Sequence, residues 1–166
     1  MEPSQAIALR TMLERAQVAA LATLHKSEPA VSMVPFALLP NGQGLVIHVS
    51  RLATHTADML AAPAVALLVA AAPDPGASPQ ELGRASVKGR AEQLAGSSPE
   101  YLEGRRHYLL KFPRAEELFA FADFSLFVVK VQSVRFVGGF AQAATVLGKQ
   151  FSSIMGDGLP DGEGTA

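Results

Sequence analysis

The segment HVSRLATHTADMLAAP, residues 48–63, concentrates hydrogen-bond donors where an apolar run passes into a helical pattern. The donors are Ser50, Arg51, Thr54, His55 and Thr56. A helix N-terminus offers unpaired N–H groups and the positive end of the helix dipole, so it readily binds phosphate. The cationic side chains would add charge-assisted hydrogen bonds. The segment therefore predicts a phosphate-binding corner, and the alternative is an ordinary helix start in which a Ser or Thr is the N-cap.

Other residues that could carry chemistry form weaker patterns. The four histidines are His25, His48, His55 and His107, and their spacing is not that of metal ligands. The chain has no cysteine, which excludes disulfides and thiolate metal sites. The glycine-rich fingerprints of the common nucleotide loops are absent as well. We therefore expect no metal site. The segment FVGGF, residues 136–140, predicts a bulge or turn, with a ligand contact as the alternative.

The composition favours one folded domain and argues against two classes of partner. Of the 166 residues, 49% are hydrophobic and 17% are charged, and the formal net charge is -1. The chain has no basic excess that would neutralise a nucleic-acid backbone. No apolar run is long enough to span a membrane, and the first residues lack the apolar core of a signal peptide. We expect a cytoplasmic protein with neither a nucleic-acid nor a membrane partner.

Turn residues divide the chain into about six strands with helices between them. We expect strands at 18–24, 30–39, 45–49, 65–71, 84–94 and 124–137, and helices at 4–16, 52–61, 97–112 and 113–121. Pro35 has no N–H, so its strand belongs at an edge, and Gly89 predicts a bulge. The strands follow one another with hairpin-like spacing. The expected fold is therefore mainly β (α+β), a six-stranded antiparallel barrel with flanking helices.

The last residues differ from the rest of the chain. The apolar pattern fades after the GGF at 138–140, and the expected domain occupies residues 1–147. Residues 148–166 form a Gly-rich tail that becomes acidic beyond Gly156. Such a segment buries too little apolar surface to offset the entropy of ordering it. We therefore expect this tail to be disordered.

Four segments, taken in order, resemble one known family. They are PAVSMVPF at 29–36, SRLATHT at 50–56, RASVKGRAE at 84–92 and FADFSLFVV followed by RFVGGFAQA at 121–143. The combination resembles the pyridoxamine 5'-phosphate oxidase-like FMN-binding split barrels, and within them it is most similar to the haem-utilisation branch. The likeness extends over about residues 5 to 147. Each segment alone would be a weak signal.

The resemblance implies a split barrel that forms a homodimer with two FMN sites at the subunit interface. It implies that Ser32, Met33, Val34 and Pro35 run along the flavin ring. It further implies that Ser50, His55 and Thr56 hold the phosphate, with Arg51 beside them. Arg84 stands where the family has a cofactor-contacting Gln or Arg.

The sequence also departs from the family pattern. Ala57-Asp58 replaces Arg-Asn, and GGFAQA replaces GGFGRA, so an arginine is lost at each place. Asp58 adds a carboxylate near the expected phosphate. Three functions follow as hypotheses: an FMN-dependent oxidoreductase of unknown substrate, a non-catalytic protein that binds haem or another flat ligand in the dimer crevice, and a family member that acts only structurally. The sequence identifies no catalytic residue.

Overall fold

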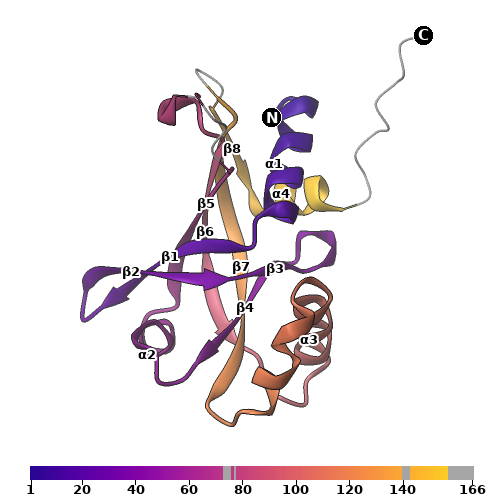
Figure 1. Cartoon of the computed structure of the whole chain (residues 1–166). Coiled ribbons are helices and arrows are strands. Elements are labelled where there is room, and N and C mark those ends of the chain that lie inside the picture. Colours follow the sequence, from indigo (N-terminus) through magenta and orange to yellow (C-terminus); the bar gives the residue numbers. More distant parts are fainter. Residues whose placement is uncertain (73–75, 77, 140–142, 157–166) are drawn as a thin grey trace.

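One antiparallel sheet of eight strands frames the computed structural model, which describes residues 1–72, 76, 78–139 and 143–156 (Figure 1). The strands are β1 (Val18–His25), β2 (Glu28–Pro35), β3 (Ala37–Leu38), β4 (Leu45–Ser50), β5 (Ala64–Ala70), β6 (Arg84–Gln93), β7 (Phe124–Val137) and β8 (Ala143–Leu147). Their order is β2-β1-β5-β6-β7-β4-β3, and β8 pairs with β7. The sheet curls into a half-barrel. The predicted mainly-β split barrel is therefore confirmed, with eight strands in place of six.

Two local features account for the larger number of strands. Pro35 ends β2, and the backbone N–H of Phe36 donates to the carbonyl oxygen of Gln17 over 3.2 Å. The expected strand 30–39 is therefore divided into β2 and β3. β8 adds to β7 in a region where the apolar pattern had faded. β2 is an edge strand of the sheet, as the proline predicts.

Two glycines have the geometry that the sequence predicts. The register between β6 and β7 shifts between Lys88 and Gly89. A Cβ on Gly89 would lie 2.5 Å from the carbonyl oxygen of Lys130, so a side chain does not fit there. Gly139 follows β7 with a φ of 147°, which glycine adopts readily. The Phe140, Ala141 and Gln142 of the GGFAQA segment lie outside the described residues.

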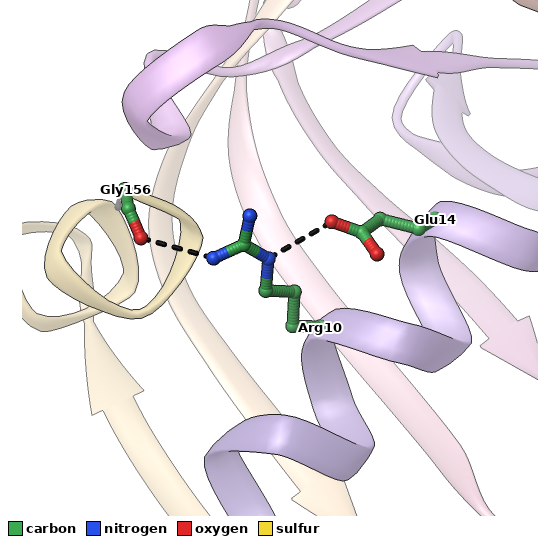
Figure 2. A network of polar contacts seen from close by, with 3 residues as sticks. All are labelled: Arg10, Glu14 and Gly156. Atoms are coloured by element: carbon green, nitrogen blue, oxygen red, sulfur yellow. Dashed lines mark hydrogen bonds and ion pairs between the residues drawn. The ribbon is translucent and has the colours of Figure 1, made fainter. Parts of the chain in front are cut away.

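Helices close the half-barrel and cover part of its outer side (Figure 1). They are α1 (Pro3–Arg15), α2 (Thr54–Ala61), α3 (Pro99–Lys111) and α4 (Gly148–Met155), with short 3-10 helices η1 (Pro40–Gly42), η2 (Pro79–Glu81) and η3 (Pro113–Ala120). Figure 2 shows how α1 is joined to the end of α4. Arg10 donates to the carbonyl oxygen of Gly156 over 3.0 Å and to the Glu14 carboxylate over 2.9 Å.

Helix α4 corrects part of the expectation for the C-terminal residues. The sequence predicts a disordered tail over 148–166, but residues 148–155 form this helix. Phe151 is fully buried, and Ile154 and Met155 join it in the core of the half-barrel. The glycine and lysine at its start hide this pattern in the sequence, whereas packing against the barrel makes it stable. Residues 157–166 lie outside the described residues.

The apolar side chains form two clusters, one on each side of the sheet. The larger cluster fills the half-barrel and includes Leu21, Ile47 and Phe127. The smaller cluster lies between α3 and the outer side of β4 and β7, and it includes Tyr108 and Leu126. Among the described residues, no helix is both long and apolar enough to cross a membrane.

Candidate functional site

The predicted corner forms where β4 ends at Ser50 and α2 begins at Thr54. The Ser50 hydroxyl is already bonded within the chain. It donates to Oδ2 of Asp123 over 3.0 Å and accepts the backbone N–H of Leu52 over 3.1 Å. A hydroxyl has one proton to donate. Ser50 therefore cannot donate to a ligand while this contact with Asp123 is in place.

Two further donors of the corner are bonded to backbone acceptors. The Arg51 guanidinium donates to the carbonyl oxygen of Ala122. Thr56 is 1% exposed, and its hydroxyl donates to the carbonyl oxygen of Ser50 over 2.6 Å. The structure thus brings Ser50, Arg51 and Thr56 together as predicted. Ser50 and Arg51 join the corner to the segment before β7, and Thr56 binds within the corner. The two hydroxyls have no further proton to donate, whereas the Arg51 guanidinium has N–H groups that these contacts do not use.

The alternative of an ordinary N-cap does not describe the corner either. The N-cap of α2 is Ala53, which has no side-chain cap hydrogen bond. Thr54 is the first residue of the helix and Ser50 lies before the turn. Instead of a local cap, a long-range contact holds the corner, because the backbone N–H of Arg51 donates to the carbonyl oxygen of Asp123 over 2.5 Å.

His55 differs from the other predicted donors. Its Nε2 atom is buried and has no hydrogen-bond partner in the described part of the chain. Burial lowers the pKa of His55, and the negative charge of Asp58 opposes this. A buried polar atom without a partner costs free energy, and ligands often satisfy such atoms. Of the side chains predicted to hold phosphate, His55 fits that role in the structure.

Asp58 points away from the place that the sequence suggested. Its carboxylate is buried, with Oδ2 2.9 Å from the Thr23 hydroxyl and Oδ1 2.7 Å from Nδ1 of His25. Burial raises the pKa of Asp58, but the hydrogen bonds from His25 and Thr23 and the charges of His25 and His55 outweigh it, so the pKa lies below its usual value. Asp58 therefore joins α2 to β1.

Sequence reasoning missed the three partners of these side chains, Thr23, His25 and Asp123. Thr23 and His25 alternate along β1, so their side chains share one face of the strand. That spacing was visible, but nothing in the sequence tells which helix would pack against this face. Asp123 lies 73 positions from Ser50, and local patterns carry no signal for such a contact.

Ser32, Met33, Val34 and Pro35 form the second half of β2. Their register with β1 places Ser32 opposite Leu21 and Met33 opposite Ala20. Val34 is buried in the half-barrel, whereas Met33 is 66% exposed on its outer side. Because β2 is an edge strand, its free side leaves backbone groups available for a ligand or another chain.

Arg84 does not join the corner within one chain. It opens β6, where it pairs with Ala70 at the end of β5 and with Val137 at the end of β7. The corner adjoins the other end of β7, where Ser50 pairs with Phe124. The two places are therefore separated by the length of β7. Arg84 donates to the carbonyl oxygen of Leu82 over 3.1 Å.

The outer side of β2, β1, β5, β6 and the adjoining end of β7 forms an exposed surface, which we call the outer face. Paired residues lie on the same side of a sheet. One row of pairs runs from β2 to β7 through Met33, Ala20, Leu68, Ser86 and Arg135, and the next runs through Val31, Ala22, Ala66, Lys88 and Ser133. The face is therefore apolar on β2, β1 and β5 and basic on β6 and β7.

One cavity lies between β6, β7 and α3, apart from the predicted residues. It has a volume of about 380 Å³ and is lined in part by Glu92, Glu100, Glu103 and Lys130. Lys130 lies 2.6 Å from Glu92, so its charge is already paired. Within the described ranges, no three His, Asp or Glu side chains are close enough together to hold a metal ion.

The model of the family described as pyridoxamine 5'-phosphate oxidase matches residues 6–138. The chain belongs to this family. Over 138 residues it is 33% identical to the chloroplastic non-canonical heme oxygenase HOZ of Arabidopsis thaliana. The matched region covers 81% of this chain and 40% of that protein. In sequence, this pyridoxamine 5'-phosphate oxidase-like chain is thus similar to a protein whose name refers to haem.

Solved structures show the same architecture. A heme binding protein from Mycobacterium smegmatis has a TM-score of 0.81 and 28% identity, over 92% of this chain and 62% of that one. ChuZ of Campylobacter jejuni has the same fold, with a TM-score of 0.78 and 20% identity over 89% of this chain and 61% of that one. A FAD-binding protein from Mesorhizobium loti also has this fold, with a TM-score of 0.62 and 19% identity over 78% of this chain and 89% of that one. The chain spans less than two thirds of the first two structures.

Proposed function

We propose that this chain forms a homodimer that binds haem, or a similar flat anionic molecule, against the outer face. The observation that carries the proposal is the division of this face into an apolar half and a basic half within continuous rows of paired residues. Haem combines a flat apolar ring with two carboxylates. Its ring would lie on side chains such as Met33 and Leu68, and its carboxylates would meet Lys88, Arg90 and Arg135.

A second copy of the chain would cover the rest of the apolar half. Val31 is 73% exposed and Leu68 is 45% exposed, and a monomer rarely leaves such a patch open to water. Burial of apolar surface contributes about 25 cal/mol per Å². The partner would also protect the free edge of β2 from other strands. The ligand would then lie in the crevice between the two copies.

The names of the relatives support haem as the ligand. The Arabidopsis relative is a heme oxygenase by name and the mycobacterial structure is a heme binding protein. Because the chain spans 40% of the first and 62% of the second, the proposal is confined to binding and includes no catalytic residue. A cytoplasmic location, suggested by the absence of cysteine, is part of the same proposal.

The second candidate is an FMN-dependent oxidoreductase, and the buried Nε2 of His55 favours it. FMN would supply the redox chemistry when bound, while the chain would position it and exclude water. His55 would donate to the phosphate, and the free edge of β2 would offer backbone groups to the ring. The hydroxyls of Ser50 and Thr56 do not fit this role as they stand, since each donates its one proton within the chain. For that reason we propose haem, and not FMN, as the first candidate ligand.

The absorbance spectrum of the purified protein, recorded before and during addition of hemin, tests both candidates. Haem binding predicts a shifted Soret band that saturates with added hemin. We expect Lys88→Gln with Arg135→Gln to weaken hemin binding about fivefold or more, because charge-assisted contacts are lost. Arg106→Gln on α3 is the matched control and should change little. A copurified flavin spectrum together with no Soret shift would favour the second candidate instead.

A further inference from the structure

The corner at the start of α2 already contains an anion, the carboxylate of Asp123. Its Oδ2 accepts the hydroxyl proton of Ser50 over 3.0 Å. Ser50 is the residue from which a bound phosphate would first be expected to receive a hydrogen bond. A ligand phosphate would therefore have to compete with Asp123 for the same proton.

The position of Asp123 is fixed by its backbone. It lies between η3 and β7, and its carbonyl oxygen accepts the N–H of Arg51 over 2.5 Å. The carbonyl oxygen of the preceding Ala122 accepts the Arg51 guanidinium. Two contacts besides the carboxylate thus hold this segment against the corner. A rotation of the Asp123 side chain alone would not remove the segment.

The charges around the corner reinforce this arrangement. Arg51 and Asp123 lie in it together, and Asp58 lies on the same helix as His55. The Asp123 carboxylate is bound at the corner, whereas the Asp58 carboxylate is bound to Thr23 and His25 of β1. Like charges at short range disfavour a second anion at the corner.

We propose that Asp123 is a specificity-determining residue: its carboxylate takes the hydrogen bond that a ligand phosphate would need, and so excludes phosphate-bearing cofactors from the corner. The inference deepens the proposed function and rests on it, because a protein that binds haem has no use for a phosphate site. The chemical class that Asp123 excludes is a flavin or nucleotide with a terminal phosphate monoester.

The test compares FMN with riboflavin, which has the same ring and no phosphate. Each is titrated by fluorescence quenching against wild type, Asp123→Ala and Glu117→Gln. Glu117 is an exposed carboxylate on η3, so it is a control for a general change of charge. We expect wild type to bind the two flavins within about threefold of each other. Asp123→Ala removes both the acceptor and the charge, so it should tighten FMN binding at least about tenfold, leave riboflavin unchanged and show a smaller gain at high salt.

Two results would overturn the proposal. The first is a wild type that already prefers FMN over riboflavin by tenfold or more. The second is an Asp123→Ala protein that is folded but gains no preference for FMN. Far-ultraviolet circular dichroism checks folding, and Asp123→Ser, which also removes the carboxylate, replaces Asp123→Ala if that variant is unfolded. A hemin titration of wild type tests the proposed function separately, since its failure would leave the comparison of the two flavins valid.

Discussion

Nδ1 of His25 lies 2.7 Å from Oδ1 of Asp58, and this pair joins the last residue of β1 to the middle of α2. The His25 side chain is 45% exposed, whereas that of Asp58 is 5% exposed. A buried carboxylate is thus held by an imidazole that reaches solvent. Thr23 donates to the other carboxylate oxygen, so both oxygens are satisfied.

His25→Ala should lower the thermal midpoint, because it leaves the buried Asp58 carboxylate with one donor fewer. Adding Asp58→Asn should recover much of the loss, since an amide needs no charge partner. Thermal denaturation of the two single variants and the double variant measures the coupling. Additive losses would show that the two residues act independently.

The stabilisation by Asp58 should also depend on pH, because the pKa of Asp58 is lowered in the fold. It should be present above the ordinary Asp pKa of 3.8 and be lost as pH falls through the lower pKa of the folded state.

Stability should also fall in mild acid because of His48. This residue is buried, with its ring 3.8 Å from that of Phe119 and nearly parallel to it. Burial lowers the pKa of His48 from 6.5 to about 4. The unfolded chain therefore binds a proton below about pH 6.5 that the folded chain accepts only near pH 4. Stability should decrease over this window as pH falls, by on the order of 1–3 kcal/mol.

The measurement for His48 is urea denaturation at a series of pH values. His48→Phe should keep the stacked packing and reduce the loss of stability between pH 6.5 and 4. His107 on α3 is half-buried and burial lowers its pKa as well, so His107→Phe measures what a second histidine contributes to the acid sensitivity. An equal acid sensitivity in wild type and His48→Phe would contradict the assignment of the effect to this residue.

Phe151→Ala should destabilise the protein by about 3–5 kcal/mol, because the phenyl ring is fully buried in the core of the half-barrel. Ser153→Ala on the exposed side of α4 should change stability by less than about 0.5 kcal/mol. Chemical denaturation measures both. A small effect of Phe151→Ala would mean that α4 packs only loosely against the half-barrel.

Removal of residues 157–166 should leave the midpoint of chemical denaturation unchanged, as expected from their Gly-rich, acidic sequence.

Met33→Asp should yield monomers, because it places a charge in the apolar half of the outer face. Leu102→Asp is the matched control, since Leu102 is 60% exposed on α3, away from this face. Sedimentation at micromolar concentration distinguishes the two. A wild type that is itself a folded monomer, or a Met33→Asp protein that remains a dimer, would contradict the proposed interface.

Local sequence patterns determined the elements that make up most of the fold. β7 has the predicted bounds of 124–137, and β6 starts at Arg84 as predicted. These strands are long and alternate clearly, so periodicity identifies them. Pro35 and Gly89 also act locally, through a missing N–H and a missing Cβ. The sequence therefore predicted an edge strand and a bulge correctly.

Only the tertiary structure decided how the corner uses its polar groups. Asp58 binds residues 33 and 35 positions earlier in the chain, and Ser50 binds Asp123 73 positions later. The residue types at 50–56 are the same whether their donors bind a ligand or a carboxylate of the chain. Which one they bind depends on the strands and turns that the fold brings against them. Helix α4 was missed for the same reason, because its three core residues have meaning only against the barrel that they fill.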